Sequence, residues 1–248
     1  HLARAARGAV AADPADGAEL LRRGVRRVTH IPIGSNIAPA PPAGYERAAW
    51  RAQHGVRPDD FLLGYFGFLN HSKGGDTLIR ALAVLAERKA PVKLVLIGGE
   101  AGASDPTDAA FGAQLERLIR RHGLEDDILR TGFISPAEVS AHLLACDALA
   151  LPYRDGASLR RGSLMAALAH GCAIVSTMPA APVPELRDGE NIRLVPAESP
   201  EALVLAVTEL LAAPALRARL GQAAQATAAL FGWDGIARRL LDFLAALD

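Results

Sequence analysis

The sequence predicts an α/β fold in which a doubly wound parallel sheet carries helices on both faces. The first observation is that short apolar runs of strand length alternate with segments of helical periodicity from residue 61 onward. The second is that these runs are apolar throughout, as in strands buried on both faces. The third is that half of the 248 residues are hydrophobic, so the chain can bury a sizeable core.

The N-terminal part of the chain predicts a smaller unit. Residues 8–12 have the composition of a short strand, residues 16–23 predict a helix that ends at Gly24, and residues 28–33 predict a second strand. The stretch Pro39-Ala40-Pro41-Pro42 is typical of a stiff linker. We expect no complete core within this unit.

Strands and helices alternate after the linker. The expected strands are 61–66, 92–97, 128–133, 148–151, 173–177 and 192–195. The expected helices are 74–88, 109–122, one beginning after Ser135, 161–170, 200–211 and 233–247. Gly123 ends the second of these helices, and Ser135 with Glu138 predicts a capping box at the start of the third.

Six strands in such an alternation predict the Rossmann-like strand order of dinucleotide-binding domains. In that order the ligand lies beyond the carboxyl ends of the first and fourth strands, where the strand order reverses. This position selects two loops, residues 67–75 and residues 153–163, as the expected ligand site.

The first loop combines glycines with a lysine at the start of a helix. Gly67 permits a turn, Gly74 permits close approach of the backbone, and the helix start offers free N–H donors. Lys73 adds a full charge, which suits a diphosphate. A solvated lysine at an ordinary helix start is the competing interpretation. The loop contains neither GxGxxG nor a P-loop, which argues against a nicotinamide or ATP site.

The second loop carries two adjacent arginines at another helix start. Arg160 and Arg161 bring two guanidinium groups to one place, which suits phosphate oxygens, and Ser158 or Ser163 can cap the helix. The competing interpretation is a solvated basic turn, as we expect for Arg22-Arg23. We favour the functional interpretation because the loop lies where the topology places the ligand.

Composition argues against several other classes. Lysine plus arginine equals aspartate plus glutamate, so no net charge favours nucleic acid or an anionic membrane. No apolar run approaches the ~20 residues of a membrane span. The seven histidines are dispersed, so we expect no metal site. Cys146 and Cys172 are expected to be reduced thiols of a cytosolic protein.

With these features in place, the chain from Ile31 onward resembles the C-terminal domain of group 1, family 4 glycosyltransferases, which have the two-domain GT-B fold. The matching segments are IPIGSN at 31–36, KGGDTL at 73–78, TGFIS at 131–135, ALAHGCAIVST at 167–177, PEL at 184–186, DGEN at 188–191 and FGW at 231–233.

The resemblance implies retaining transfer of a hexosyl group from a nucleotide sugar, without a metal ion or another cofactor. The acceptor, a glycan, lipid or small molecule, would bind mainly to an N-terminal domain. The residues expected at the donor phosphates are Gly67, Lys73, Gly74, Arg160, Arg161 and Ser163. Those expected at the nucleoside are Phe133, Ile134, Ser158 and Leu164, although Phe133 and Ile134 also suit a core position. The catalytic residues stay unassigned.

The sequence departs from the family at three positions. The two glutamates of the family's Glu-x7-Glu motif fall on Ser158 and Ala166, and the usual arginine after the first glycine is replaced by Phe68. These departures leave open a catalytically degenerate module that binds a nucleotide sugar or a partner. An epimerase of the same architecture is a weaker alternative, because Asp155 is the one obvious acid near the donor.

The domain organisation follows from the same resemblance. Residues 1–38 are expected to be a remnant of the N-terminal domain and the crossing between domains, 39–230 the nucleotide-sugar-binding domain, and 231–248 a closing helix. The chain starts with His1 rather than Met, so we expect further sequence upstream. We therefore expect this chain alone to be inactive. The expected location is the cytoplasm, with peripheral contact to the inner membrane through the missing half.

Overall fold

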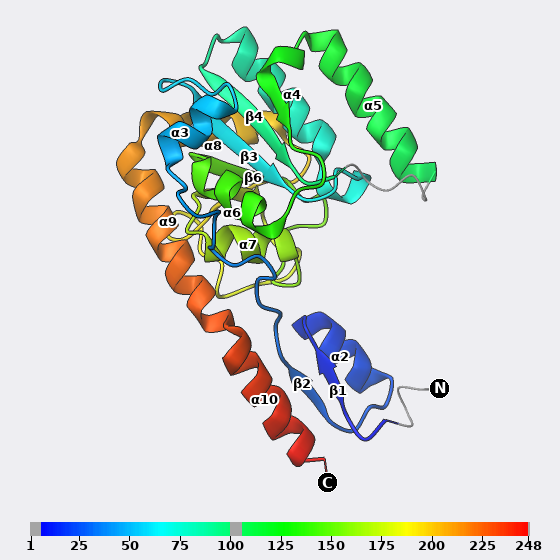
Figure 1. Ribbon diagram of the computed structural model, residues 1–248. Helices are drawn as coiled ribbons and strands as arrows, with labels where there is room; N and C mark the ends of the chain where they lie inside the picture. Colours follow the sequence, from blue (N-terminus) through cyan, green and yellow to red (C-terminus); the bar gives the residue numbers. More distant parts are fainter. Residues whose placement is uncertain (1–5, 100–105, 248) are drawn as a thin grey trace.

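The computed structural model describes residues 6–99 and 106–247 and is built around a six-stranded parallel sheet (Figure 1). The strands are β3 (Phe61–Phe66), β4 (Val92–Ile97), β5 (Ile128–Arg130), β6 (Ala148–Leu151), β7 (Ile174–Thr177) and β8 (Arg193–Val195). Their spatial order is β5-β4-β3-β6-β7-β8. Counted from the first strand of this sheet, that order is 3-2-1-4-5-6, so the predicted Rossmann-like topology is confirmed.

Helices cover both faces of this sheet (Figure 1). They are α3 (Arg47–Gln53), α4 (Gly75–Glu87), α5 (Pro106–His122), α6 (Pro136–Ala145), α7 (Gly162–Ala169), α8 (Pro200–Ala212) and α9 (Pro214–Ala228). Helix α4 packs against α5 and α8, whereas α3 packs against α6 and α7 against α9. The predicted doubly wound α/β architecture is therefore confirmed.

The two central strands, β3 and β6, are buried along almost their whole length. Leu63 pairs with Ala148 and Gly64 with Leu149 in the parallel register. A Cβ atom on Gly64 would lie 2.6 Å from the Cys146 sulfur, so this strand position requires a glycine. The apolar runs identified these strands because neither face meets water.

The structure corrects the prediction at several elements. β5 ends at Arg130 instead of residue 133, because Gly132 has a φ of 64° and leaves the strand conformation. Helix α3 was not predicted, although the Glu46 carboxylate caps it by accepting hydrogen bonds from two backbone N–H groups. Helix α9 was also missed, because it buries small residues such as Gly221 and Ala224 and therefore shows little apolar periodicity.

The N-terminal segment forms a separate two-stranded parallel sheet. Strands β1 (Ala9–Ala11) and β2 (Val28–His30) flank α2 (Pro14–Arg22), so both strands are shorter than predicted. Helix α10 (Trp233–Ala245) runs alongside this unit in Figure 1. The Arg239 guanidinium donates to the His30 carbonyl oxygen over 2.6 Å. The closing helix therefore contacts the N-terminal residues.

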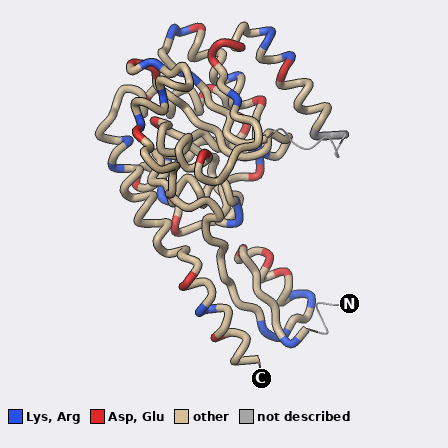
Figure 2. Tube along the Cα trace, viewed as in Figure 1, with Lys and Arg blue, Asp and Glu red and all other residues tan. Residues whose placement is uncertain are grey.

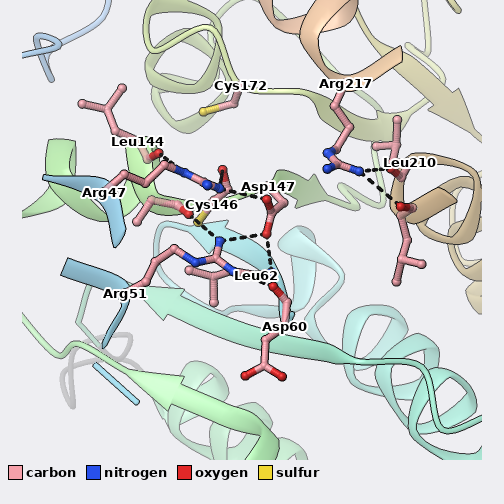
Figure 3. A network of polar contacts seen from close by, with 12 residues as sticks. Arg47, Arg51, Asp60, Leu62, Leu144, Cys146, Asp147, Cys172, Leu210 and Arg217 are labelled. Atoms are coloured by element: carbon pink, nitrogen blue, oxygen red, sulfur yellow. Dashed lines mark hydrogen bonds and ion pairs between the residues drawn. The ribbon is translucent and has the colours of Figure 1, made fainter. Parts of the chain in front are cut away.

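A buried polar network joins α3 to the amino ends of β3 and β6 (Figure 3). One Asp147 oxygen accepts hydrogen bonds from the Leu62 N–H and the Arg51 guanidinium, both over 2.8 Å. Arg51 also donates to the carbonyl oxygens of Ala145 and Asp60. The other Asp147 oxygen pairs with Arg47 over 2.8 Å. Burial raises the pKa of Asp147, but the hydrogen bonds from Arg51 and the Leu62 N–H together with the arginine charge outweigh it, so the pKa is lowered.

A cavity of about 260 Å³ lies beside this network, between α3, α6 and strands β4 and β5. Its wall includes the rings of Trp50, His54 and His142, and the two histidine rings meet edge to face at 4.7 Å. Burial and the nearby His54 lower the pKa of His142 to about 4, whereas Glu138 raises it. The folded chain therefore favours the neutral form of His142 over the protonated form.

Within residues 6–99 and 106–247, no helix is both long and apolar enough to cross a membrane.

We expect Asp147→Ala to lower the free energy of unfolding by about 3–5 kcal/mol, because it leaves the buried Arg51 guanidinium without its carboxylate. Glu190→Ala is the control, since it removes an exposed pair with Arg187 and should cost about 0–1 kcal/mol. Urea unfolding of both variants measures the difference. Equal losses would show that the network contributes no more than a surface pair.

His142→Phe should reduce the acid sensitivity of the fold while keeping the aromatic packing. The folded pKa of about 4 lies below the unfolded value of ~6.5, so the unfolded chain takes up the proton first. The depressed pKa of His142 therefore contributes to the free energy of unfolding fully above pH ~6.5, and this contribution is lost as the pH falls toward 4. From pH 7 to pH 5 the wild type should lose about 2 kcal/mol more than the variant in urea unfolding. A parallel loss in both proteins would contradict this assignment.

Candidate functional site

The two predicted loops meet at the carboxyl ends of β3 and β6. The Arg154 N–H donates to the Ser72 carbonyl oxygen over 3.0 Å. Gly74 has a φ of 68°, and a Cβ on it would lie 2.0 Å from the Pro152 carbonyl oxygen. This glycine therefore lets one loop pack against the other. The close backbone approach that the sequence predicted toward a ligand is made here toward Pro152.

Ion pairs hold the two loops in this arrangement. The Arg154 guanidinium pairs with Asp76 of α4 over 2.7 Å and with Glu198, which precedes α8, over 2.5 Å. The second loop is also fixed to β7, because the Thr177 hydroxyl donates to the Tyr153 carbonyl oxygen. The loops therefore form a preorganised surface at the point where the strand order of the sheet reverses.

Two cationic groups converge on the buried ring of Tyr153. The Lys73 ammonium lies 5.2 Å from the ring centroid and the Arg161 guanidinium carbon lies 4.9 Å from it. The Tyr153 hydroxyl lies 2.7 Å from the Ser163 hydroxyl oxygen, and a Cβ on Gly67 would lie 3.9 Å from the Ser163 side chain. The structure thus brings together four of the six residues expected at the phosphates.

The electrostatics of this cluster favour an anion. Burial lowers the pKa of Lys73, the Arg161 charge lowers it further, and Asp155 raises it. In the described part of the chain, no carboxylate forms an ion pair with Lys73. The Arg161 side chain is only 15% exposed, and its buried Nε–H lacks a hydrogen-bond partner among the described residues. An anion at this position would satisfy a donor that the chain leaves unpaired.

The start of α7 adds backbone donors to the same place. Arg161 occupies the N-cap position, and its side chain makes no capping hydrogen bond there. The N–H groups of Gly162 and Ser163 are therefore not satisfied by this cap, whereas the Leu164 N–H donates to the Tyr153 hydroxyl. These backbone donors lie at the same end of α7 as the Arg161 guanidinium, and helix starts of this kind favour anions.

Arg160 and Ser158 face away from this cluster, toward the N-terminal unit. The Arg160 guanidinium pairs with Asp16 of α2 over 3.0 Å and lies 3.9 Å from Asp13. The Ser158 hydroxyl donates to Asp13 over 3.2 Å. The arginine pair therefore divides, because the N-terminal carboxylates bind one guanidinium and leave the other at the loops. Of the two arginines predicted at the phosphates, Arg161 lies at the loops and Arg160 pairs with the N-terminal unit.

The residues expected at the nucleoside also separate. Phe133 is 91% exposed, and both it and Phe68 lie 3.8 Å from the position of a Cβ on Gly99. Ile134 lines the cavity beside α6, and the Leu164 side chain is fully buried in the core. Of these expected side chains, Phe133 presents an open aromatic surface near the loops, whereas the Leu164 side chain points into the core.

Ala166 is fully buried on α7, and its carbonyl oxygen accepts hydrogen bonds from the backbone and the ring of His170. Alanine therefore offers no polar side-chain atom at position 166 to a ligand. Sequence reasoning missed Tyr153, the ring that organises the site. The signal was an aromatic residue two positions after a buried strand, at the start of a basic loop.

As far as the structure is described, no cluster of three or more His, Cys, Asp or Glu side chains is placed to hold a metal ion.

Comparison with known proteins assigns the chain to a family. Residues 46–227 match the family of group 1 glycosyl transferases. The chain belongs to this family. It is 31% identical over 232 residues to a D-inositol 3-phosphate glycosyltransferase of Kineococcus radiotolerans, a match that covers 87% of the chain and 51% of the relative. The chain therefore spans about half the length of the curated relatives it matches.

Solved structures of glycosyltransferases share the fold of this family member. HepE of Anabaena, solved in complex with UDP, has a TM-score of 0.84 at 23% identity and covers 99% of this chain and 65% of its own. The C-terminal domain of the group 1 family protein LpcC from Francisella tularensis has a TM-score of 0.65 at 23% identity, covering 80% of this chain and 97% of that domain. The chain therefore has the fold of the C-terminal half of a GT-B glycosyltransferase.

The contact between the loops can be tested with two glycines of the same conformation. Gly74 and Gly123 have φ values of 68° and 61°, but a Cβ on Gly123 would meet nothing within 4 Å. Gly123→Ala should cost only the ~1 kcal/mol of a left-handed alanine, and Gly74→Ala about 2–4 kcal/mol, because Pro152 must also move. Urea unfolding measures both, and equal losses would mean that the loops do not pack closely.

Proposed function

We propose that this chain is the donor-binding half of a retaining, family 4 glycosyltransferase and holds the diphosphate of a nucleotide sugar between the loops after β3 and β6. The observation that carries this proposal is the convergence of Lys73 and Arg161 on Tyr153. Within the described residues Lys73 forms no ion pair, and Arg161 has an unsatisfied buried N–H. Their position coincides with the ligand position of this topology.

The proposed chemistry uses these cations on the leaving group. As the bond between the sugar's anomeric carbon and the phosphate oxygen breaks, negative charge grows on the nucleoside diphosphate. Lys73 and Arg161 would stabilise that charge in a partly desolvated site, and the N–H groups at the start of α7 would add to them. Two fixed cations supply what a metal ion would otherwise provide, so we propose that transfer is independent of metal.

The nucleoside is proposed to lie toward the ends of β4 and β5. Phe133 exposes an aromatic face there, and stacking on an aromatic ring contributes about 1–3 kcal/mol per base. Such stacking tolerates any nucleobase. The UDP in the solved HepE structure supports a uridine nucleotide as the first ligand to test.

The acceptor and the rest of the active site are proposed to belong to an N-terminal domain. The curated relatives are about twice as long as this chain, and α10 exposes Leu241 and Leu244 beside the N-terminal unit. An acceptor glycan, lipid or small molecule would approach from that domain. Alone, the chain would bind the donor without transferring it. Two unpaired thiols, Cys146 and Cys172, support a cytoplasmic location.

A degenerate binding module is the second candidate, and the geometry around α7 favours it in one respect. Ala166 is buried and carries no carboxylate, and Ser158 binds Asp13. Neither position can therefore act as the glutamates of the family motif do. Incubation of the full-length protein with UDP-sugars, and detection of released UDP, separates the two candidates.

Lys73→Ala should weaken nucleoside diphosphate binding by about 1.5–3 kcal/mol, or ~10–150-fold in Kd, because a charge-assisted contact is lost. Arg161→Ala should act in the same direction. Arg160→Ala is the matched control and should change Kd less than twofold, since Arg160 pairs with Asp16.

Calorimetric titration with UDP, GDP and ADP, each with and without magnesium, measures these affinities. Equal affinities of wild type and Lys73→Ala would refute the phosphate site. A strict magnesium requirement would refute the metal-free mechanism.

A further inference from the structure

Asp155 occupies the cationic site from within the chain. Both of its carboxylate oxygens contact the same nitrogen of the Arg161 guanidinium. A carboxylate placed on a guanidinium in this way presents two anionic oxygens, as a phosphate group would. The side chain therefore stands where the proposed donor phosphate would contact Arg161.

The backbone around Asp155 is held in place. Gly156 has a φ of 86°, and a Cβ on it would lie 2.5 Å from the Met178 carbonyl oxygen. The Ala157 N–H donates to the Thr177 carbonyl oxygen over 3.1 Å, and on the other side Arg154 carries its two ion pairs. The chain at this turn cannot withdraw without breaking these contacts.

The side chain of Asp155, by contrast, is free to turn outward. It is 53% exposed, whereas the Arg161 side chain that it contacts is 15% exposed. Rotation about its side-chain bonds would move the carboxylate into water, where it is well solvated. The arginine would stay against the Tyr153 ring, 4.9 Å from the ring centroid.

The contact between Asp155 and Arg161 changes the net charge of the site. Lys73 and Arg161 together carry two positive charges, and Asp155 cancels one of them while it is paired. A nucleoside diphosphate has to displace the carboxylate before it meets both cations. The same carboxylate is then available to return to Arg161 when the diphosphate leaves.

We propose that Asp155 is a built-in competitor of the donor diphosphate: it neutralises Arg161 in the empty site and speeds release of the nucleoside diphosphate after transfer. This inference rests on the proposed function. It assigns to Asp155 an effect on affinity and on dissociation rate, and no contact with the reacting sugar.

Asp155→Asn tests this role because it keeps the shape of the side chain and removes its charge. The Kd for UDP should fall about 10-fold, as expected when a competing charge leaves a partly desolvated site. Most of the change should be in the dissociation rate, measured by stopped-flow displacement. In an Arg161→Ala background the same substitution should change Kd less than it does in the wild type, because the direct contact is gone and only the weaker interaction of Asp155 with Lys73 is left.

Asp16→Asn is the matched control, since it removes the same charge from the partner of the neighbouring Arg160 and should change Kd less than twofold. Weaker binding by Asp155→Asn would overturn the proposal and make Asp155 a residue that orients Arg161 for phosphate. Unchanged binding, with wild-type affinity still dependent on Lys73, would overturn this inference alone. Failure of both wild type and Asp155→Asn to bind UDP, GDP or ADP would overturn the proposed function together with it.

Discussion

Asp147 joins the amino ends of β3 and β6, because one carboxylate oxygen accepts hydrogen bonds from both the Leu62 N–H and the Arg51 guanidinium. These are the two strands between which the strand order of this parallel sheet reverses. Their carboxyl ends are joined in turn by the approach of Gly74 to Pro152 and by the Arg154 N–H bond to Ser72. The positions of the two loops depend on this double attachment, since both loops continue directly from these strands.

The formal net charge is zero, and basic and acidic residues are interspersed along the chain (Figure 2). Several arginines, such as Arg187 and Arg193, pair with carboxylates at the surface, where such pairs contribute little to stability. At the switch point, Lys73 and Arg161 are partly buried against Tyr153, and Asp155 is the one carboxylate that contacts Arg161 there within the described residues. Because charge interacts more strongly away from water, a single carboxylate can set the affinity of this site.

The neighbouring arginines show how a basic loop can serve two parts of a protein. Arg161 lies against the Tyr153 ring and faces the loop after β3, whereas Arg160 reaches Asp13 and Asp16 at the start of α2. The second loop therefore contacts the N-terminal unit through the residue next to the one that faces the proposed ligand. Any change in the position of that unit would act on the loop through this pair.

Apolar runs and glycine positions were sufficient to predict the sheet, its strand order and the two loops, because parallel strands buried on both faces leave few topologies open. That order in turn placed Lys73, Arg161, Gly67 and Ser163 near one another. The direction of a side chain was beyond such reasoning, since it depends on contacts distant in sequence. Arg160 turns toward Asp16, 144 residues away, and Leu164 turns into the core because packing of α7 requires it. Likewise, Gly74 serves loop packing, because only the folded chain brings Pro152 against it. The sequence determined the place of the site, and tertiary packing decided which side chains face it.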